Sequence, residues 1–247
     1  MLIWFASGNM HKKKELADIL ADKLKSTDWE LKIPIEAGLE FTPDETGNSF
    51  LENALIKAEA LYKLLDNTGF YKKIQPQSTW SLEEENINDL VYPPCSSVVI
   101  SDDSGLCVDA LGGRPGIHSA RYGDSHCGRY GGAKLTAAEK NAQLLSELGD
   151  KPNRKARFVC AMVLYFGTGR FFAAQETMEG ELVKTARGEG GFGYDPILFI
   201  PQLGRTVAEL SEEEKNRISH RGKAGRAIAG MLYGTIKPQL IQQNDSV

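Results

Sequence analysis

Short apolar runs and helically spaced apolar residues follow one another along the chain. The run from Leu2 to Ala6 ends at a Ser-Gly-Asn turn, which predicts a buried strand. Apolar residues then recur at helical spacing from Leu16 to Leu24, which predicts a helix that begins near His11. The chain therefore opens with a strand, a glycine-containing loop and a helix.

Capping-box patterns mark the starts of later helices. Ser49, Thr136 and Ser211 each stand three residues before a Glu, the spacing at which the two side chains satisfy each other's backbone N–H groups. Apolar stripes at helical spacing follow the first two of these serine and threonine caps. These two stripes predict helices at 51–65 and 137–148, and the pattern at 224–232 predicts a further helix.

The remaining apolar runs predict strands. Gly167-Thr168-Gly169 separates two long runs, which predicts an antiparallel hairpin. Because strands and helices are interleaved and one pair is antiparallel, we predict an α/β fold with a mixed sheet. The strands predicted after the first lie at 31–35, 98–101, 157–166, 170–181 and 197–200.

Residues 66–97 have no apolar period. The stretch contains three prolines and the acidic run Glu83-Glu84-Glu85, and it is long for a loop inside a compact domain. Neither flank completes a fold without the other. We therefore interpret 66–97 as an insertion with at most one short helix, in a single domain that comprises residues 1–247.

The composition is that of a globular protein with a slight excess of acid. Hydrophobic residues make up 41% and charged residues 25%, which excludes intrinsic disorder, and the formal net charge is −4. A chain with this charge lacks the basic surface that binds nucleic-acid polymers. An anionic partner is therefore expected to be small and to be held by a local group of cations.

The cysteines and the chain's start predict a soluble cytoplasmic protein. None of the four cysteines forms a CxxC pair, so free thiols in a reducing compartment are expected rather than a zinc ribbon. At the N-terminus the apolar run precedes the lysines, the reverse of a signal peptide. No apolar run approaches the roughly 20 residues that cross a bilayer, so no membrane partner is expected.

The first candidate for chemistry is the loop between the first strand and helix. A helix start offers free N–H groups and the positive end of a dipole, which suit phosphate oxygens. Gly8 allows close approach of the backbone, and Ser7, Asn9 and Lys12 can donate hydrogen bonds. The alternative is a solvated basic helix start.

Two adjacent carboxylates form the second candidate. Asp102 and Asp103 follow a predicted strand, and ligands of open α/β sheets bind beyond the carboxyl ends of strands. Mg²⁺ takes one or two protein carboxylates and shares its remaining positions with water and phosphate, and Glu45 can supply a further carboxylate. A carboxylate at such a site can also deprotonate water. The alternative is an acidic surface turn.

The glycine-rich segment 188–193 matches GxGxxG, but it does not indicate a dinucleotide site. That motif must open a helix, whereas Asp195 here precedes a proline, which disfavours helix. A loop that carries Phe192, Tyr194 and Asp195 instead suits a flat ligand, on which an aromatic ring can stack. Further on, Lys215, His220 and Arg221 can bind phosphate or donate to a ligand, although a solvated basic helix end explains the same residues.

Absent motifs exclude several common enzyme classes. The sequence contains no GxxxxGK[ST], which excludes P-loop kinases and GTPases. It also contains neither HExxH nor GxSxG, the signatures of common zinc and serine hydrolases.

Together these segments resemble the inosine/xanthosine triphosphate pyrophosphatase family. The resemblance rests on ordered blocks, and Ser7 stands where members of that family often have Thr. The blocks are SGNMHKKKEL (7–16), ETGNSFLENALIKA (45–58), SDDSGLCVDALGGRPGIHSARYG (101–123), GEGGFGYDPILFIP (188–201) and AELSEEEKNRISHRGKA (208–224).

The resemblance implies a fold and a role for each matching residue. The implied fold is an elongated mixed sheet with two lobes around a central nucleotide cleft, in a homodimer. Asp103 would be the proton acceptor and a Mg²⁺ ligand, with Glu45 and Asp102 as further metal contacts. The implied substrate-binding residues are Ser7, Gly8, Asn9, Met10, His11, Lys12, Ser104, Phe192, Gly193, Tyr194, Asp195, Lys215, His220 and Arg221.

The implied reaction is hydrolysis of dITP, ITP or XTP to the monophosphate and pyrophosphate, by attack of water on the α-phosphorus. Two alternatives remain open at this point. One is a pyrophosphatase of other modified or pyrimidine triphosphates, like the related septum-inhibitor fold, and the other is a nucleotide-binding regulator without catalysis.

Overall fold

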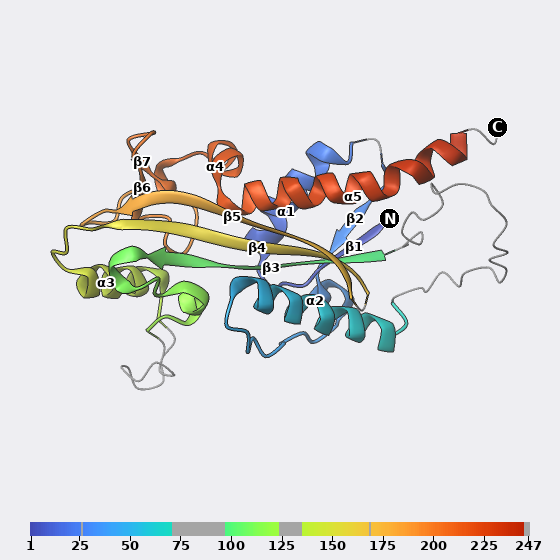
Figure 1. Cartoon of the computed structure of the whole chain (residues 1–247), viewed down its shortest axis with the longest axis horizontal. Helices are drawn as coiled ribbons and strands as arrows, with labels where there is room; N and C mark the ends of the chain where they lie inside the picture. The colour runs from blue at the N-terminus through green and yellow to red at the C-terminus, as the bar shows by residue number, and fades with distance from the viewer. Residues whose placement is uncertain (26, 71–96, 124–134, 168, 245–247) are drawn as a thin grey trace.

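In the computed structural model, a seven-stranded sheet extends along the molecule and helices cover both of its faces (Figure 1). Strands β3, β4 and β5 are the longest and run along the long axis of the molecule. The predicted elongated mixed sheet is therefore confirmed. The structure describes residues 1–25, 27–70, 97–123, 135–167 and 169–244, with side chains up to Thr235.

The elements lie close to their predicted positions. The helices are α1 (Met10–Lys23), α2 (Phe50–Asn67), α3 (Ala137–Leu148), α4 (Glu212–Ile218) and α5 (His220–Asn244). The strands are β1 (Leu2–Phe5), β2 (Glu30–Lys32), β3 (Ser97–Val108), β4 (Lys155–Gly167), β5 (Arg170–Leu182), β6 (Leu198–Ile200) and β7 (Arg205–Thr206).

The sheet has the order β2-β1-β3-β4-β5-β6-β7. Strand β1 is parallel to both β2 and β3, whereas every pair from β3 to β7 is antiparallel. The β1–β3 pairing ends where Phe5 lies beside Ile100, but β3 continues to Val108. Among the described residues, no strand pairs with β3 on its β1 side beyond that point, and Cys107 forms an isolated bridge with Pro115.

The prediction that the strand before Asp102 ends at Ser101 is wrong. Strand β3 continues through the two aspartates because its backbone stays paired with β4, from Val99 opposite Tyr165 to Val108 opposite Ala156. The alternative of an acidic surface turn is excluded as well, because the two aspartate side chains have partners inside the protein. The carboxyl end that leaves room for a ligand is that of β1.

Side chains on β3 alternate between two covered faces. Val98 and Ile100 belong to an apolar core with α1 and α5, whereas Val99 packs in a second core with α2. Figure 1 shows α1 and α5 on one face of the sheet and α2 on the other. Since neighbouring residues of a strand point to opposite faces, Asp102 lies on the α1–α5 face and Asp103 on the α2 face.

The capped helices are confirmed in detail. The Ser49 side chain accepts a hydrogen bond from the Glu52 N–H, and Thr136 and Ser211 form complete capping boxes at α3 and α4. The hairpin of β4 and β5 is confirmed as well.

Three boundaries differ from the prediction. The strand predicted at 31–35 ends at Lys32, because Pro34 begins a 3₁₀ helix. The two-residue strand β7 was not predicted. The last helix begins at His220 rather than near Ala224, so residues 220–223 form its first turn.

Two predictions fall largely outside the described residues. Helix α2 ends at Asn67 and β3 begins at Ser97, so the predicted insertion is described only up to residue 70. Of the four cysteines the structure describes two, Cys107 and Cys160, and both are free thiols as expected. None of the described helices combines the length and the apolar composition that crossing a bilayer requires.

Candidate active site

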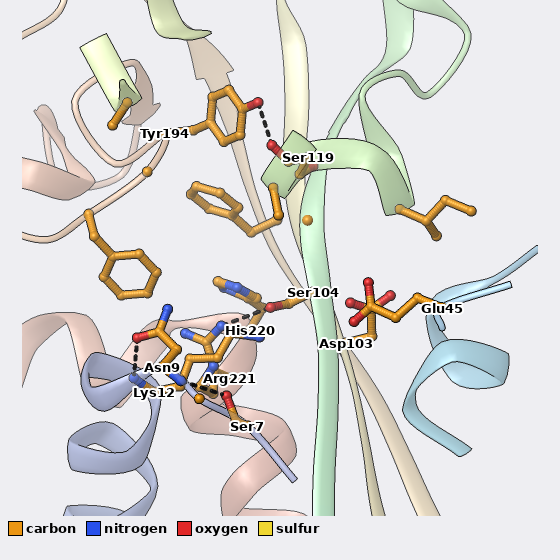
Figure 2. A pocket seen from close by; sticks show the side chains of 18 of the residues that line it. Ser7, Asn9, Lys12, Glu45, Asp103, Ser104, Ser119, Tyr194, His220 and Arg221 are labelled. Carbon is orange, nitrogen blue, oxygen red and sulfur yellow. Dashed lines mark hydrogen bonds between the residues drawn. The ribbon is translucent and has the colours of Figure 1, made fainter. Parts of the chain in front are cut away.

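A cavity of about 490 Å³ opens beside β3, where β1 has ended. Because β3 has no neighbouring strand there, side chains from both faces of the sheet reach the same space. In Figure 2, Asp103 and Glu45 lie on one side of β3, and Ser7, Lys12, His220 and Arg221 lie on the other. The predicted site residues that line the cavity are Ser7, Gly8, Asn9, Lys12, Glu45, Asp103, Ser104, Phe192, Gly193, Tyr194, Asp195, Lys215, His220 and Arg221.

Three predicted site residues do not line the cavity. Met10 is 57% exposed at the start of α1. His11 is exposed as well, and its ring stacks on the ring of Phe192 with 5.5 Å between centroids. Asp102 is completely buried behind the cavity wall.

The loop before α1 is organised by Asn9. Its Oδ1 accepts hydrogen bonds from the N–H groups of His11 (2.9 Å) and Lys12 (3.3 Å), which caps the helix. Its own N–H donates to the Ser7 hydroxyl at 3.2 Å. Two N–H groups that the sequence assigned to phosphate therefore have a partner within the protein, and Lys12 supplies the charge at this end of the cavity.

Asp102 joins two cations across the α1–α5 face. The Lys12 ammonium contacts both carboxylate oxygens, at 3.0 and 2.9 Å, and Arg221 Nε donates to Oδ2 at 3.2 Å. Burial alone would raise the pKa of Asp102, but Lys12 and Arg221 lower it well below its usual range. Asp102 is therefore ionised, and both of its carboxylate oxygens contact cations of the protein.

The network of ion pairs extends from Arg221 toward the glycine-rich segment and Asp195. Glu15 on α1 accepts from Arg221 Nη1 at 2.6 Å and pairs with the Lys215 ammonium at 3.0 Å. Lys215 also donates to Asp195 at 2.9 Å, and Asp195 accepts the N–H of Phe192 at 2.8 Å. Anions and cations thus alternate in an unbroken chain from Asp195 to Lys12.

The interpretation of Lys215, His220 and Arg221 as a solvated helix end is wrong, since all three are buried. The exposed fractions are only 7%, 5% and 3%. Each nitrogen of Arg221 contacts a protein oxygen, the third being Nη2, which donates to Ser104 Oγ at 2.8 Å. The position of the Arg221 guanidinium is therefore fixed by contacts within the protein.

On the α2 face, Asp103 has different surroundings. Asn53 Nδ2 donates to its Oδ2 at 3.1 Å, and the Lys57 ammonium lies 3.4 Å from its Oδ1. The same ammonium donates to Glu45 at 2.8 Å, so Lys57 joins the two carboxylates. Burial raises the pKa of Asp103 above its usual value although Lys57 opposes this shift. A raised pKa makes Asp103 a better proton acceptor.

The predicted metal group of Glu45, Asp102 and Asp103 does not form one cluster. The two aspartates point to opposite faces of β3, and Asp102 is occupied by Lys12 and Arg221. Within the described part of the chain, no three His, Cys, Asp or Glu side chains are grouped closely enough to hold a metal ion by themselves. Asp103 and Glu45 remain as a pair of carboxylates open to the cavity.

The opposite wall is formed by three segments tied together by hydrogen bonds. The Tyr194 hydroxyl donates to the Ser119 carbonyl at 2.9 Å, and Asn141 Nδ2 on α3 donates to the Gly193 carbonyl at 3.1 Å. The Lys215 ammonium lies 4.4 Å from the centre of the Phe192 ring. Figure 2 shows the Tyr194 hydroxyl directed to Ser119, with a dashed line that marks their hydrogen bond.

Two buried polar atoms of residues that line the cavity have no hydrogen-bond partner. They are Asn141 Oδ1 and His220 Nδ1. The His220 ring stacks on Phe158 at 4.9 Å, and burial together with Arg221 lowers its pKa well below 6.5, so the ring is neutral. Since an unpaired buried polar atom costs about 1–3 kcal/mol, these two atoms mark places where a ligand's polar edge can bind.

Several of these residues were missed by the sequence analysis. Asn53 and Lys57 are spaced four apart on α2, where they interrupt the buried apolar stripe, and that interruption was the available signal. Glu15 and Asn141 lie on helices whose polar residues are mostly solvated, so nothing in the sequence distinguished them. Ser119 acts through its backbone carbonyl, which no side-chain pattern reveals.

The sequence is similar to known proteins over nearly its whole length. Residues 3–231 match the Ham1 family. A dITP/XTP pyrophosphatase from Treponema denticola is 40% identical over 235 residues, which cover 95% of this chain and 100% of the relative. A protein of the same name from Thermus thermophilus is 38% identical over 232 residues, which cover 92% of this chain and 90% of the relative.

Solved structures show the same fold. The Ham1 protein of Staphylococcus aureus superposes with a TM-score of 0.70 and is 32% identical, covering 95% of this chain and 99% of its own. The HAM1 protein of Coxiella burnetii gives a TM-score of 0.72 at 31% identity, with the same coverage of 95% and 99%. On its sequence and its fold alike, this chain belongs to the Ham1 family.

Proposed function

We propose that this chain is a nucleoside triphosphate pyrophosphohydrolase that converts dITP, ITP and XTP to the monophosphate and pyrophosphate. The observation that carries the proposal is the cavity beside β3, which combines a buried base at Asp103 with cations on the opposite side of the strand. The names of the Treponema and Thermus relatives support the same activity.

In this proposal the triphosphate lies across the edge of β3. The Lys12 ammonium, which Asp102 holds at the start of α1, attracts the phosphate oxygens and stabilises charge that develops as the anhydride bond breaks. The Ser7 hydroxyl and the backbone at Gly8 lie beside it. Such fixed donors act without reorganisation at the moment of reaction.

Asp103 then accepts the proton of the attacking water. Its raised pKa favours this, and Asn53 fixes the orientation of its carboxylate. Water attacks the α-phosphorus, a new P–O bond forms, and the bond to the bridging oxygen breaks. The electron pair leaves with pyrophosphate.

The residues at Asp103 also fit a magnesium ion. Mg²⁺ needs only one or two protein carboxylates when phosphate and water complete its shell. Asp103 and Glu45 both line the cavity and both contact the Lys57 ammonium, so these two carboxylates lie close enough together to contact one cation. When bound there, Mg²⁺ would neutralise the triphosphate and lower the pKa of a coordinated water.

Selectivity for the base is proposed at the wall formed by Phe192 to Asp195. The partnerless atoms of Asn141 and His220 offer sites for the polar edge of the base, whereas the Phe192 ring already contacts the His11 ring and the Lys215 ammonium. Hypoxanthine and xanthine carry an O6 acceptor and an N1–H donor, whereas adenine carries an amine and an N1 acceptor. A site that leaves buried polar groups unpaired with the wrong base discriminates by about 10⁴-fold.

The proposal is tested by product analysis on a nucleotide panel. The protein is incubated with Mg²⁺ and dITP, ITP, XTP, GTP, ATP or dUTP. We expect pyrophosphate and monophosphate from the first three at rates far above that for ATP. Preference for dUTP or another pyrimidine substrate would support the alternative specificity, and tight ITP binding without product would support a regulator. Release of orthophosphate would contradict the proposal.

The homodimer that the resemblance implies and the cytoplasmic location expected from the cysteines and the chain's start stay predictions. A homodimer would be recognised by the mass of the protein in light scattering, and a monomer at enzyme concentrations that give full activity would contradict it. The cytoplasmic location would be tested by fractionation of cells that produce the protein.

A further inference from the structure

Asp102 is the most completely buried charge at the site, and nothing in the reaction proposed above uses it directly. Its side chain is 0% exposed, and it lies behind the wall of the cavity rather than in it. A buried carboxylate is costly unless its partners compensate it. The identity of those partners therefore indicates what Asp102 does.

The partners come from two segments that are far apart in the sequence. Lys12 stands in the first turn of α1 and Arg221 in the first turn of α5. Lys12 contacts both oxygens of Asp102, and Arg221 contacts one of them. Ser104 Oγ lies 3.4 Å from Asp102 Oδ2 and accepts from Arg221 Nη2, which closes a small ring of contacts.

The contacts of Lys12 fix the place of its ammonium group. A lysine side chain has many rotamers, and a solvated one would have to be ordered each time a ligand binds. Here the ammonium contacts both oxygens of Asp102, and Lys12 still lines the cavity with a side chain that is 16% exposed. The ammonium is therefore fixed at the cavity wall.

We infer that Asp102 is a positioning residue, which presets Lys12 and Arg221 for the nucleotide and does not bind the metal ion. This inference rests on the proposed function, because it assigns a role within that site. It also gives the adjacent aspartates separate roles. Asp103 acts on the attacking water and the metal ion, and Asp102 fixes the position of Lys12 and Arg221.

The first test compares metal binding with nucleotide use in Asp102→Asn. The variant keeps the shape of the side chain at position 102 but loses its negative charge. Arg221 keeps Glu15 and Ser104 as partners. We expect kcat/KM for ITP to fall roughly 10- to 100-fold, the effect of losing a hydrogen bond to a charged group. We expect Mn²⁺ binding, measured by calorimetry without nucleotide, to stay within about twofold of the wild type.

Glu45→Gln is the matched control, since it removes the charge of a carboxylate on the other side of β3. It should weaken Mn²⁺ binding, whereas Asp102→Asn should not. Loss of Mn²⁺ binding in Asp102→Asn to the same degree as in Glu45→Gln would overturn the inference. Thermal unfolding is recorded for every variant, and Asp102→Ser replaces the Asn variant if that one unfolds.

A double-mutant cycle tests whether Asp102 acts through Lys12. If it does, Asp102→Asn should reduce kcat/KM much less in a Lys12→Met background than in the wild type. If the loss in kcat/KM of the double variant equals the product of the losses of the two single variants, the inference is overturned. If no triphosphate is hydrolysed by the wild type, the proposed function fails, but the Mn²⁺ comparison still tests whether Asp102 is a metal ligand.

Discussion

The two faces of β3 use neighbouring carboxylates in opposite ways. On the α1–α5 face, Asp102 is enclosed by Lys12 and Arg221, and these cations lower its pKa despite its burial. On the α2 face, Asp103 lines the cavity, and its burial raises its pKa despite Lys57. The difference shows that the number and closeness of cations, rather than burial alone, decide which carboxylate has a lowered pKa and which has a raised one.

Strand geometry makes this division possible. Adjacent residues on a strand point to opposite faces, so two aspartates that follow each other in sequence enter different environments. Ordinarily a sheet would keep those environments apart. Here β1 ends at Phe5, and both faces of β3 reach one cavity around the free edge.

The largest effect is expected from Asp103→Asn. Loss of the proton acceptor should reduce kcat for ITP by about 10²–10⁴-fold, the usual contribution of a general base. Nucleotide binding, measured by calorimetry, should change only a few-fold because the cations lie on the other side of β3. Turnover close to that of the wild type would show that Asp103 is not the base.

A smaller loss is expected from Lys57→Met, which removes the cation between Asp103 and Glu45. Lys57 lowers the pKa of Asp103, so its removal raises that pKa further, and a higher pH is then needed to keep the base ionised. The acidic limb of the kcat/KM–pH profile should therefore move to higher pH.

Lys63→Met is the control for Lys57→Met, since Lys63 lies on the same helix with a side chain that is 73% exposed. It should leave the pH profile unchanged. An acidic limb that stays in place in Lys57→Met would separate Lys57 from the titration of Asp103.

Gly105→Ala tests the packing next to Asp103. A Cβ there would lie 2.2 Å from the Gly116 carbonyl oxygen and 2.5 Å from Ser119 Oγ, so the 3₁₀ helix at Gly116–Arg121 must shift. We expect a loss of about 1–3 kcal/mol in the free energy of unfolding, measured with urea. Gly8→Ala meets nothing within 4 Å and should change it by less than about 0.5 kcal/mol.

The smallest effect concerns His220 on the α1–α5 face. Its pKa is lowered in the folded protein, so below pH 6.5 the unfolded chain binds a proton that the folded protein does not. The free energy of unfolding should therefore fall as the pH drops from 6.5 toward 5. Urea titrations of His220→Gln should show a weaker decline over this range, and an equal decline would assign it to other groups.

The helix starts of this fold are predictable from the sequence, because the patterns that mark them involve residues close together in the chain. The caps at Ser49, Thr136 and Ser211 each place a helix start correctly, since the capping contact spans only three residues. The extent of β3 was not predictable in this way. Its polar centre is stabilised by Lys12 from α1 and Asn53 from α2, which are distant in sequence.

The candidate site shows the same limit. Side chains that line the cavity, such as Lys12 and Asp103, stand in motifs that indicate their chemistry. Glu15 and Lys57 act through contacts with residues on other elements, and only the fold reveals those contacts. The division between Asp102 and Asp103 depends on which face each side chain takes, and a strand predicted to end at Ser101 assigns neither residue to a face.

The measurement that tests the account most directly is hydrolysis of ITP in water enriched in oxygen-18, with the products separated and weighed by mass spectrometry. Attack of water on the α-phosphorus predicts that the label appears in inosine monophosphate and that unlabelled pyrophosphate is released. Label in pyrophosphate, or release of orthophosphate, would contradict the account.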